Sequence, residues 1–299
     1  DYTDRNEVSQ LVREATTDLD SQGRNRAEMF RFNPGMDRVI FPKHHPYYNL
    51  SIQAKTVITD MADKREVKNG FAAKTIAEAE EAFRTQLGVK CRLDGFKKSD
   101  MAQVQEIFAC VSHHFTDFPE LRDKIKFVGS VKGRVAALED VKYTELCKLN
   151  PGMQDDVLRK YAKNWAKRMA GCSSSTYAYS SKNFTEYALN GLAFNSTWAG
   201  TKVKKQLEYD VQHKFHPVGC DTVKAVFDHE LGHKIDEMLS LYTDPDFLAI
   251  YNPAKAQGER FIADNLSAYA YCTSFFRKSN YTPQKEFIAE AWSEYRNNE

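Results

Sequence analysis

The stretch that decides the fold is residues 221–239, which read DTVKAVFDHELGHKIDEML. Asp221 or Thr222 can cap the start of a helix, because a short polar side chain accepts a hydrogen bond from the first free backbone amides. Apolar residues then recur at helical spacing, and they are Val223, Val226, Phe227, Leu231, Ile235 and Met238. The spacing predicts one amphipathic helix that buries this side.

Two histidines on the predicted helix indicate a metal site. His229 and His233 are four residues apart, so a helix presents both imidazoles on one face. That geometry suits two nitrogen ligands of one Zn²⁺, each about 2.0–2.1 Å from the ion. Glu230 lies about 100° further round the helix and can act as general base on a zinc-activated water. Gly232 would permit a close backbone approach, and two solvent-facing histidines on an ordinary helix are the alternative.

A second predicted helix supplies the third ligand that catalytic zinc requires. Residues Lys285–Tyr295 have apolar residues at helical spacing, and Glu286 and Glu290 lie on one face. Two carboxylates beside an apolar stripe are costly to bury unless a positive charge meets them. We assign Glu286 as the third zinc ligand and Glu290 as the residue that orients a ligand histidine, with a solvated glutamate pair as the alternative.

These motifs resemble the anthrax lethal factor-like metallopeptidases, a gluzincin group that includes many phage-encoded relatives. The resemblance rests on His229-Glu230-Leu231-Gly232-His233, followed 57 positions after His229 by the run EFIAEA that begins at Glu286. His216-Pro217-Val218-Gly219 also looks like the phage-borne version, which is often joined to a minor capsid or head-morphogenesis protein. The resemblance implies an α+β, zincin-like domain over residues 72–299, in which a small sheet lies over the HExxH helix.

The same resemblance implies how a substrate would bind. Gly191–Trp198 would be the edge strand of the sheet and would hold an extended polypeptide by strand addition. The family uses a tyrosine before the glutamate helix to stabilise the oxyanion, but its usual position is Ser279 here. Tyr281 and Tyr269 are the remaining candidates, and we slightly prefer Tyr269.

The sequence therefore predicts a zinc-dependent endopeptidase. One alternative is a phage structural or head-morphogenesis protein whose zinc domain serves assembly, self-processing or delivery, with other phage structural proteins as partners. Another is a toxin-like effector protease that acts on a host protein. The chemistry would be the same in each case, and the target would differ.

Composition excludes several other classes of function. The 42 Lys and Arg balance 41 Asp and Glu, so the net charge of +1 predicts neither nucleic acid nor a membrane surface as a partner. No apolar run reaches the roughly 18 residues of a membrane helix, and the start of the chain lacks the pattern of a signal peptide. The six cysteines form no Cys-x-x-Cys pair, and we expect mostly buried free thiols. A soluble protein of a phage virion or the cytoplasm is favoured over a secreted one.

The rest of the chain predicts a helical N-terminal segment, residues 1–71, before the metallopeptidase domain. That segment combines an amphipathic helix over 7–20 with an arm over 31–48 that is rich in proline and aromatic residues. Further helices are expected over 74–86, 99–114 and 153–170, strands over 89–93 and 125–128, and a loop or irregular hairpin over 171–183. The remaining histidines, including the adjacent pairs His44-His45 and His113-His114, offer only a weak case for a second metal site.

Overall fold

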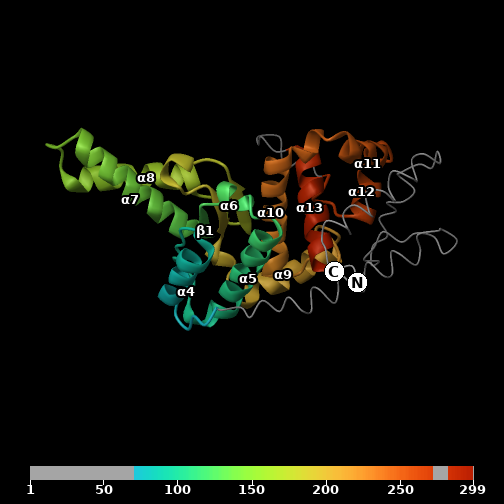
Figure 1. The fold of residues 1–299 in the computed structure, drawn as a ribbon, viewed down its shortest axis with the longest axis horizontal. Helices are drawn as coiled ribbons and strands as arrows, with labels where there is room; N and C mark the ends of the chain where they lie inside the picture. The colour runs from blue at the N-terminus through green and yellow to red at the C-terminus, as the bar shows by residue number, and fades with distance from the viewer. Residues whose placement is uncertain (1–70, 272–281, 299) are drawn as a thin grey trace.

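The computed structural model describes residues 71–271 and 282–298 as an α+β protein that is mostly helical (Figure 1). The strands are β1 (Phe127–Ser130), β2 (Ala178–Ser181) and β3 (Gly191–Phe194). The helices are α4 (Ile76–Ala82), α5 (Met101–Asp117), α6 (Leu121–Lys124), α7 (Val131–Leu149), α8 (Asp155–Ala170), α9 (Thr201–Gln212), α10 (Val223–Leu239), α11 (Pro245–Ala256), α12 (Glu259–Asn265) and α13 (Pro283–Asn297). The helix expected over 7–20 and the arm expected over 31–48 lie outside the described residues.

The three strands form one sheet in the order β1–β3–β2, with β1 parallel and β2 antiparallel to β3. The central strand is therefore β3, and the prediction that Gly191–Trp198 is the edge strand is wrong. All four residues of β3 are buried, which is typical of an interior strand covered on both faces. The edge beside α10 is β2, which lies in the segment for which we expected a loop or an irregular hairpin.

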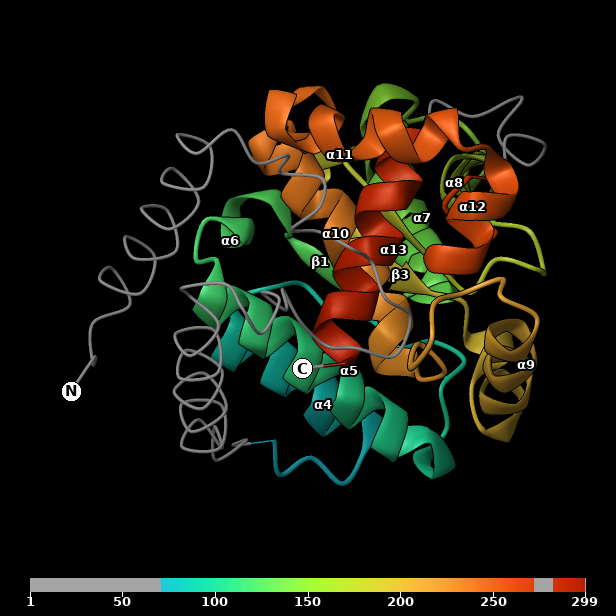
Figure 2. The same ribbon diagram turned by 90° about the vertical axis from the view of Figure 1, so that its right-hand side faces the viewer.

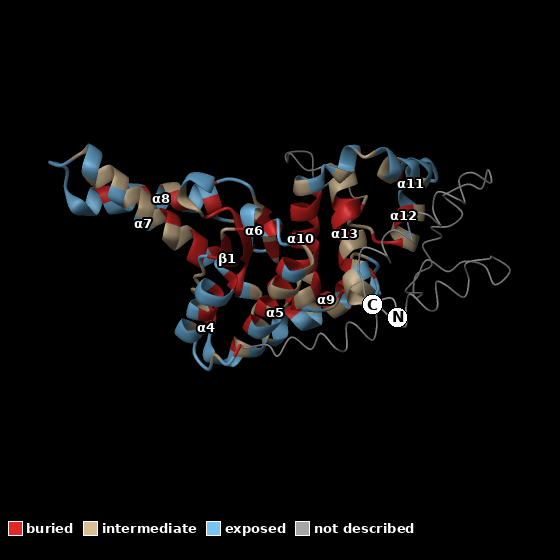
Figure 3. Cartoon of the chain, in the orientation of Figure 1, coloured by how far each residue is buried: buried red, intermediate tan, exposed pale blue. Residues whose placement is uncertain are grey.

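Two cores cover the two faces of the sheet. Val128, Leu192 and Phe194 belong to the larger core, which includes residues of α5 and α10. Phe127 and Ala193, on the opposite face, join a smaller core with residues of α7 and α8. The α7–α8 pair extends away from the rest of the molecule as a helical hairpin with an exposed tip (Figures 1 and 3). The sheet therefore separates this hairpin from the helix that carries the histidine motif.

That helix, α10, runs through the middle of the fold. Thr222 caps it as expected, since its hydroxyl accepts a hydrogen bond from the amide of Ala225 at 3.1 Å. Every residue from Asp228 to Asp236 is buried, because α5, β2 and α13 pack around the helix. A Cβ atom on Gly232 would lie 2.9 Å from Cα of Ala289, so the glycine permits α10 and α13 to pack closely (Figure 2).

Most of the expected helices are present. The helix over 74–86 is α4 continued by a π-turn over Phe83–Leu87, and it ends at Gly88 with a φ of 72°. The segments 99–114, 153–170 and 285–295 correspond to α5, α8 and α13. The strand over 125–128 is β1, shifted by two residues, whereas 89–93 contributes only a bridge between Lys90 and Phe127. Helices α6, α7, α9, α11 and α12 were not predicted.

No helix in the described part of the chain is long and apolar enough to span a membrane. The five cysteines of that part have free thiols, as expected, but only Cys110 and Cys220 are buried, and Cys272 lies outside it.

Candidate metal centre

The structure brings the three predicted metal ligands together. His229 and His233 extend from α10, and Glu286 extends from the first turn of α13. All three are buried, with exposed fractions of 9%, 8% and 2%. One potential ligand atom from each lies within 4.8 Å of the other two. The pairing of α10 with α13 therefore unites residues that are 57 positions apart in the sequence.

Both histidines direct the same nitrogen toward one carboxylate oxygen. Nε2 of His229 lies 3.3 Å from Oε2 of Glu286, and Nε2 of His233 lies 3.4 Å from the same oxygen. Burial alone would raise the pKa of Glu286, but the two histidines outweigh it and lower the pKa to about 2. Burial would likewise lower the pKa of His229, yet Glu286 and Glu290 raise it well above its ordinary value. The carboxylate is therefore ionised and ready to bind a cation.

These atoms fit a zinc ion. Two ligands that each lie about 2.0–2.1 Å from a tetrahedral ion are about 3.3–3.4 Å apart, the spacing found between each histidine and Glu286. Oε2 of Glu286 is buried and receives no hydrogen bond of normal geometry. An ion between these atoms would take the place of any proton on the imidazole nitrogens that face the carboxylate. His229, His233 and Glu286 would hold the metal.

Glu290 occupies the position predicted for a residue that orients a histidine. Its Oε1 lies 2.7 Å from Nδ1 of His229, the ring nitrogen that does not face Glu286. Burial would raise the pKa of Glu290, but His216 and His229 lower it, so the carboxylate is ionised while 1% exposed. A carboxylate on Nδ1 fixes the orientation of the ring and directs Nε2 to the metal position.

Glu230 lies beside the ligands and contacts the edge strand. The residue is 7% exposed, and burial raises the pKa of its carboxyl group. His229 and His233 act in the opposite direction, and so does a hydrogen bond from the backbone amide of Ser180 in β2. The side chain of Glu230 therefore links α10 to the edge strand β2 through the amide of Ser180.

Tyr269 is the tyrosine that the fold brings to the site. Its ring centroid lies 5.6 Å from that of His229, and its backbone amide donates to the carbonyl of Phe215 at 3.2 Å. The preference for Tyr269 over Tyr281 as the oxyanion donor stays a prediction. Tyr281 lies outside the described residues.

A buried arginine lies on the other side of the edge strand. Arg134, in the first turn of α7, is fully buried between the rings of Phe127 and Tyr179, 4.9 Å from each centroid. Burial lowers its pKa, while Tyr179 and the charge of Glu230 act to raise it. The interaction with Glu230 favours the ionised carboxylate that a general base requires.

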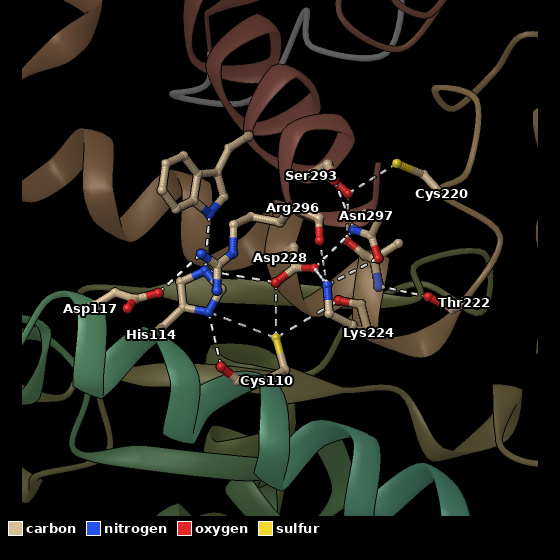
Figure 4. Close-up of polar contacts among 12 residues, drawn as sticks. Cys110, His114, Asp117, Cys220, Thr222, Lys224, Asp228, Ser293, Arg296 and Asn297 are labelled. Atoms are coloured by element: carbon tan, nitrogen blue, oxygen red, sulfur yellow. Dashed lines mark hydrogen bonds and ion pairs between the residues drawn. The ribbon is translucent and has the colours of Figure 1, made fainter. Parts of the chain in front are cut away.

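A second group of three metal-binding residue types lies next to the first. Cys110 and His114 on α5 approach Asp228, which precedes His229 on α10 (Figure 4). Their ligand atoms also lie within 4.8 Å of one another, and all three residues are buried. On distance and residue type alone, this group is as good a metal site as the first.

Its hydrogen bonds argue against that role. The indole of Trp292 can only donate, so at 3.0 Å it occupies the lone pair on Nε2 of His114. Nδ1 of the same ring therefore carries the proton and donates to the carbonyl of Cys110 at 2.9 Å. The thiol of Cys110 donates to Asp228 at 3.0 Å, and burial raises its pKa well above the ordinary value. Lys224 is already 2.8 Å from the other oxygen of Asp228.

Sequence reasoning missed two residues at the first site. His216 and Ser267 both contact Glu290, from loops 74 and 23 positions away in the sequence. The only signal was the run that begins at His216, which we noted for its resemblance and to which we gave no role. Contacts of this kind carry no periodic pattern, so spacing could not reveal them.

Comparison of the chain with protein-family models, with curated proteins and with solved structures gave no match. The function must therefore be argued from the residues of the site itself.

Proposed function

We propose that the chain is a zinc-dependent endopeptidase with a zincin-like fold. One observation carries the proposal: Nε2 of His229 and Nε2 of His233 lie 3.3 and 3.4 Å from the same buried oxygen of Glu286. Three ligands of this type leave a fourth position for water or substrate, which is the composition of a catalytic zinc site. A purely structural zinc site would have four protein ligands.

Bound zinc would supply a Lewis acid that polarises a peptide carbonyl and acidifies a water molecule. Glu230 would take the proton of that water and later deliver it to the leaving amine. Burial raises the pKa of Glu230, which brings it closer to the range in which a carboxyl group both accepts and releases a proton. The hydroxyl of Tyr269 would donate a hydrogen bond to the oxyanion that develops on the substrate.

The sheet offers an edge for the substrate. The carbonyl of Tyr177 accepts the amide of Asn195, so alternate residues of β2 direct their backbone groups toward β3. Ala178 and Ser180, which are both buried, accordingly direct theirs away from β3, where the amide of Ser180 donates to Glu230. An extended peptide that paired with this edge would pass the general base. We therefore move the role that we assigned to Gly191–Trp198 to β2.

Replacement of Glu230 by glutamine tests the proposal. The variant should bind zinc as the wild type does and should hydrolyse peptides about 10²–10⁴-fold more slowly, because glutamine cannot accept the proton. Zinc-loaded protein would be assayed against a library of quenched fluorescent peptides. Glu259→Gln, an exposed position on α12, is the matched control and should leave the rate unchanged.

Two results would contradict the proposal. One is wild-type hydrolysis by the Glu230→Gln variant with zinc bound. The other is a wild-type protein that binds zinc and cleaves no member of the library.

A further inference from the structure

Glu290 contacts more partners than a residue needs to orient one histidine. Besides the 2.7 Å contact with Nδ1 of His229, its Oε1 lies 3.2 Å from Nδ1 of His216. Its Oε2 accepts a hydrogen bond of 2.7 Å from the hydroxyl of Ser267. Ser267 is fully buried, and the side chain of His216 is 15% exposed. Hydrogen bonds from His216 and Ser267 therefore converge on the ionised carboxylate that faces Nδ1 of His229.

The hydroxyl of Ser267 links this carboxylate to the loop of Tyr269. It donates to Glu290 and accepts the backbone amide of Ala270 at 3.1 Å, so it closes the turn that contains Tyr269. A backbone hydrogen bond joins this loop to the loop of His216, because the amide of Ala268 donates to the carbonyl of Lys214 at 2.7 Å. The loop of Tyr269 and the loop of His216 thus form one hydrogen-bonded unit anchored on Glu290.

This hydrogen-bonded unit lies next to one metal ligand, His229. The ring of Tyr269 lies 5.6 Å from the ring of His229 and also 5.6 Å from the ring of His216. A change in the position of Glu290 would therefore move the ring of His229 and the loop of Tyr269 together. Packing alone would not require a hydroxyl and an imidazole N–H to converge on the same carboxylate that orients His229.

We propose that His216 and Ser267 are positioning residues that act through Glu290. They fix the carboxylate, the carboxylate fixes the ring of His229, and Ser267 holds Tyr269 beside that ring. The part played by Tyr269 rests on the proposed endopeptidase function. The effect on His229 does not, because it concerns metal binding alone.

The test compares two amide replacements of His216 in the full chain. In His216→Asn the amide nitrogen stands the same number of bonds from the backbone as Nδ1, so it can still donate to Glu290. In His216→Gln the amide lies one bond further out, and the donor is misplaced. Zinc affinity would be measured by competition with a chromophoric chelator, and the visible absorption of the cobalt-substituted protein would report ligand geometry.

We expect His216→Gln and Ser267→Ala to weaken zinc binding about 10–100-fold and to shift the cobalt bands. His216→Asn should retain most of the affinity and the wild-type spectrum. His213→Gln is the matched control, since this exposed histidine at the end of α9 stacks on the ring of Tyr209 and bonds its carbonyl, and it should change neither reading.

Two outcomes would overturn the inference. In one, His216→Gln and Ser267→Ala lower thermal stability but leave zinc affinity and the cobalt spectrum unchanged, which would make both residues purely structural. In the other, the wild type binds no zinc. If the variants behave as expected but the wild type hydrolyses no peptide, the proposed function fails while this inference stands.

Discussion

Two groups of three buried side chains, each of metal-binding types, lie next to each other along α10, and they differ in their hydrogen bonds. In the group of His229, His233 and Glu286, two ring nitrogens face a carboxylate oxygen that receives no hydrogen bond of normal geometry. In the group of Cys110, His114 and Asp228, the described contacts already engage the ring, the thiol and the carboxylate. Residue type and distance alone do not identify a metal site, and the hydrogen bonds already made decide between the two.

The comparison predicts that the second group contributes stability. Asp228 is fully buried and is contacted by Lys224 at 2.8 Å, Cys110 at 3.0 Å and Asn297 at 2.9 Å. Asp228→Ala leaves these donors without their acceptor, so it should lower the free energy of unfolding by about 3–5 kcal/mol. Urea unfolding of the zinc-free protein would measure the loss.

Asp228→Asn is the control for that variant, since it keeps the size and one oxygen and should cost less. A loss below about 1 kcal/mol for Asp228→Ala would contradict the prediction, because a solvent-exposed ion pair contributes that much.

The second group should also make stability depend on pH. Burial is the main cause that lowers the pKa of His114 from 6.5 to about 4. As the pH falls, the unfolded chain therefore takes up the proton before the folded protein does. The contribution of His114 is complete above pH 6.5 and declines by up to about 3 kcal/mol as the pH falls to about 4.

This dependence is measured as the difference between wild type and His114→Gln in the free energy of unfolding from pH 7 to pH 4. Chelator in all samples removes contributions from metal binding. A difference that stays constant over this range would contradict the assignment of a neutral buried imidazole.

A smaller effect is expected where α10 meets α13. A Cβ atom at position 232 would lie 2.9 Å from Cα of Ala289 and 3.1 Å from Cβ of Trp292. Gly232→Ala should separate the helices and cost up to about 2 kcal/mol, because overpacking of about 1–3 kcal/mol is offset by only about 1 kcal/mol of gain in helix propensity. Zinc affinity should fall as well, since His229 and Glu286 lie on different helices.

Thermal unfolding and chelator competition would check both effects of Gly232→Ala. Gly152→Ala, in the connection between α7 and α8 with no heavy atom within 4 Å of the new Cβ, should be neutral. Unchanged zinc affinity in the Gly232 variant would mean that the spacing of the two helices does not control the site.

Helical periodicity explains which parts of the site could be predicted from the sequence. The histidines of α10 and the glutamates of α13 follow a helical period, so spacing alone predicted their helices, their faces and their roles. The edge strand was misassigned because β3 and a solvent-edged strand have similar composition, and only the pairing with β1 and β2 distinguishes them. The contacts of Glu290 with His216 and Ser267 join loops, and no period describes them.

The most direct test of the account is the zinc content of the two groups. Chelator-washed protein would be reloaded with zinc, freed of excess by gel filtration and analysed by elemental mass spectrometry. The account predicts about one zinc per chain in the wild type, in Cys110→Ser and in His114→Gln, and none in His233→Ala or Glu286→Ala. Two zinc ions in the wild type, or zinc that is lost from the Cys110 and His114 variants and kept by His233→Ala, would contradict it.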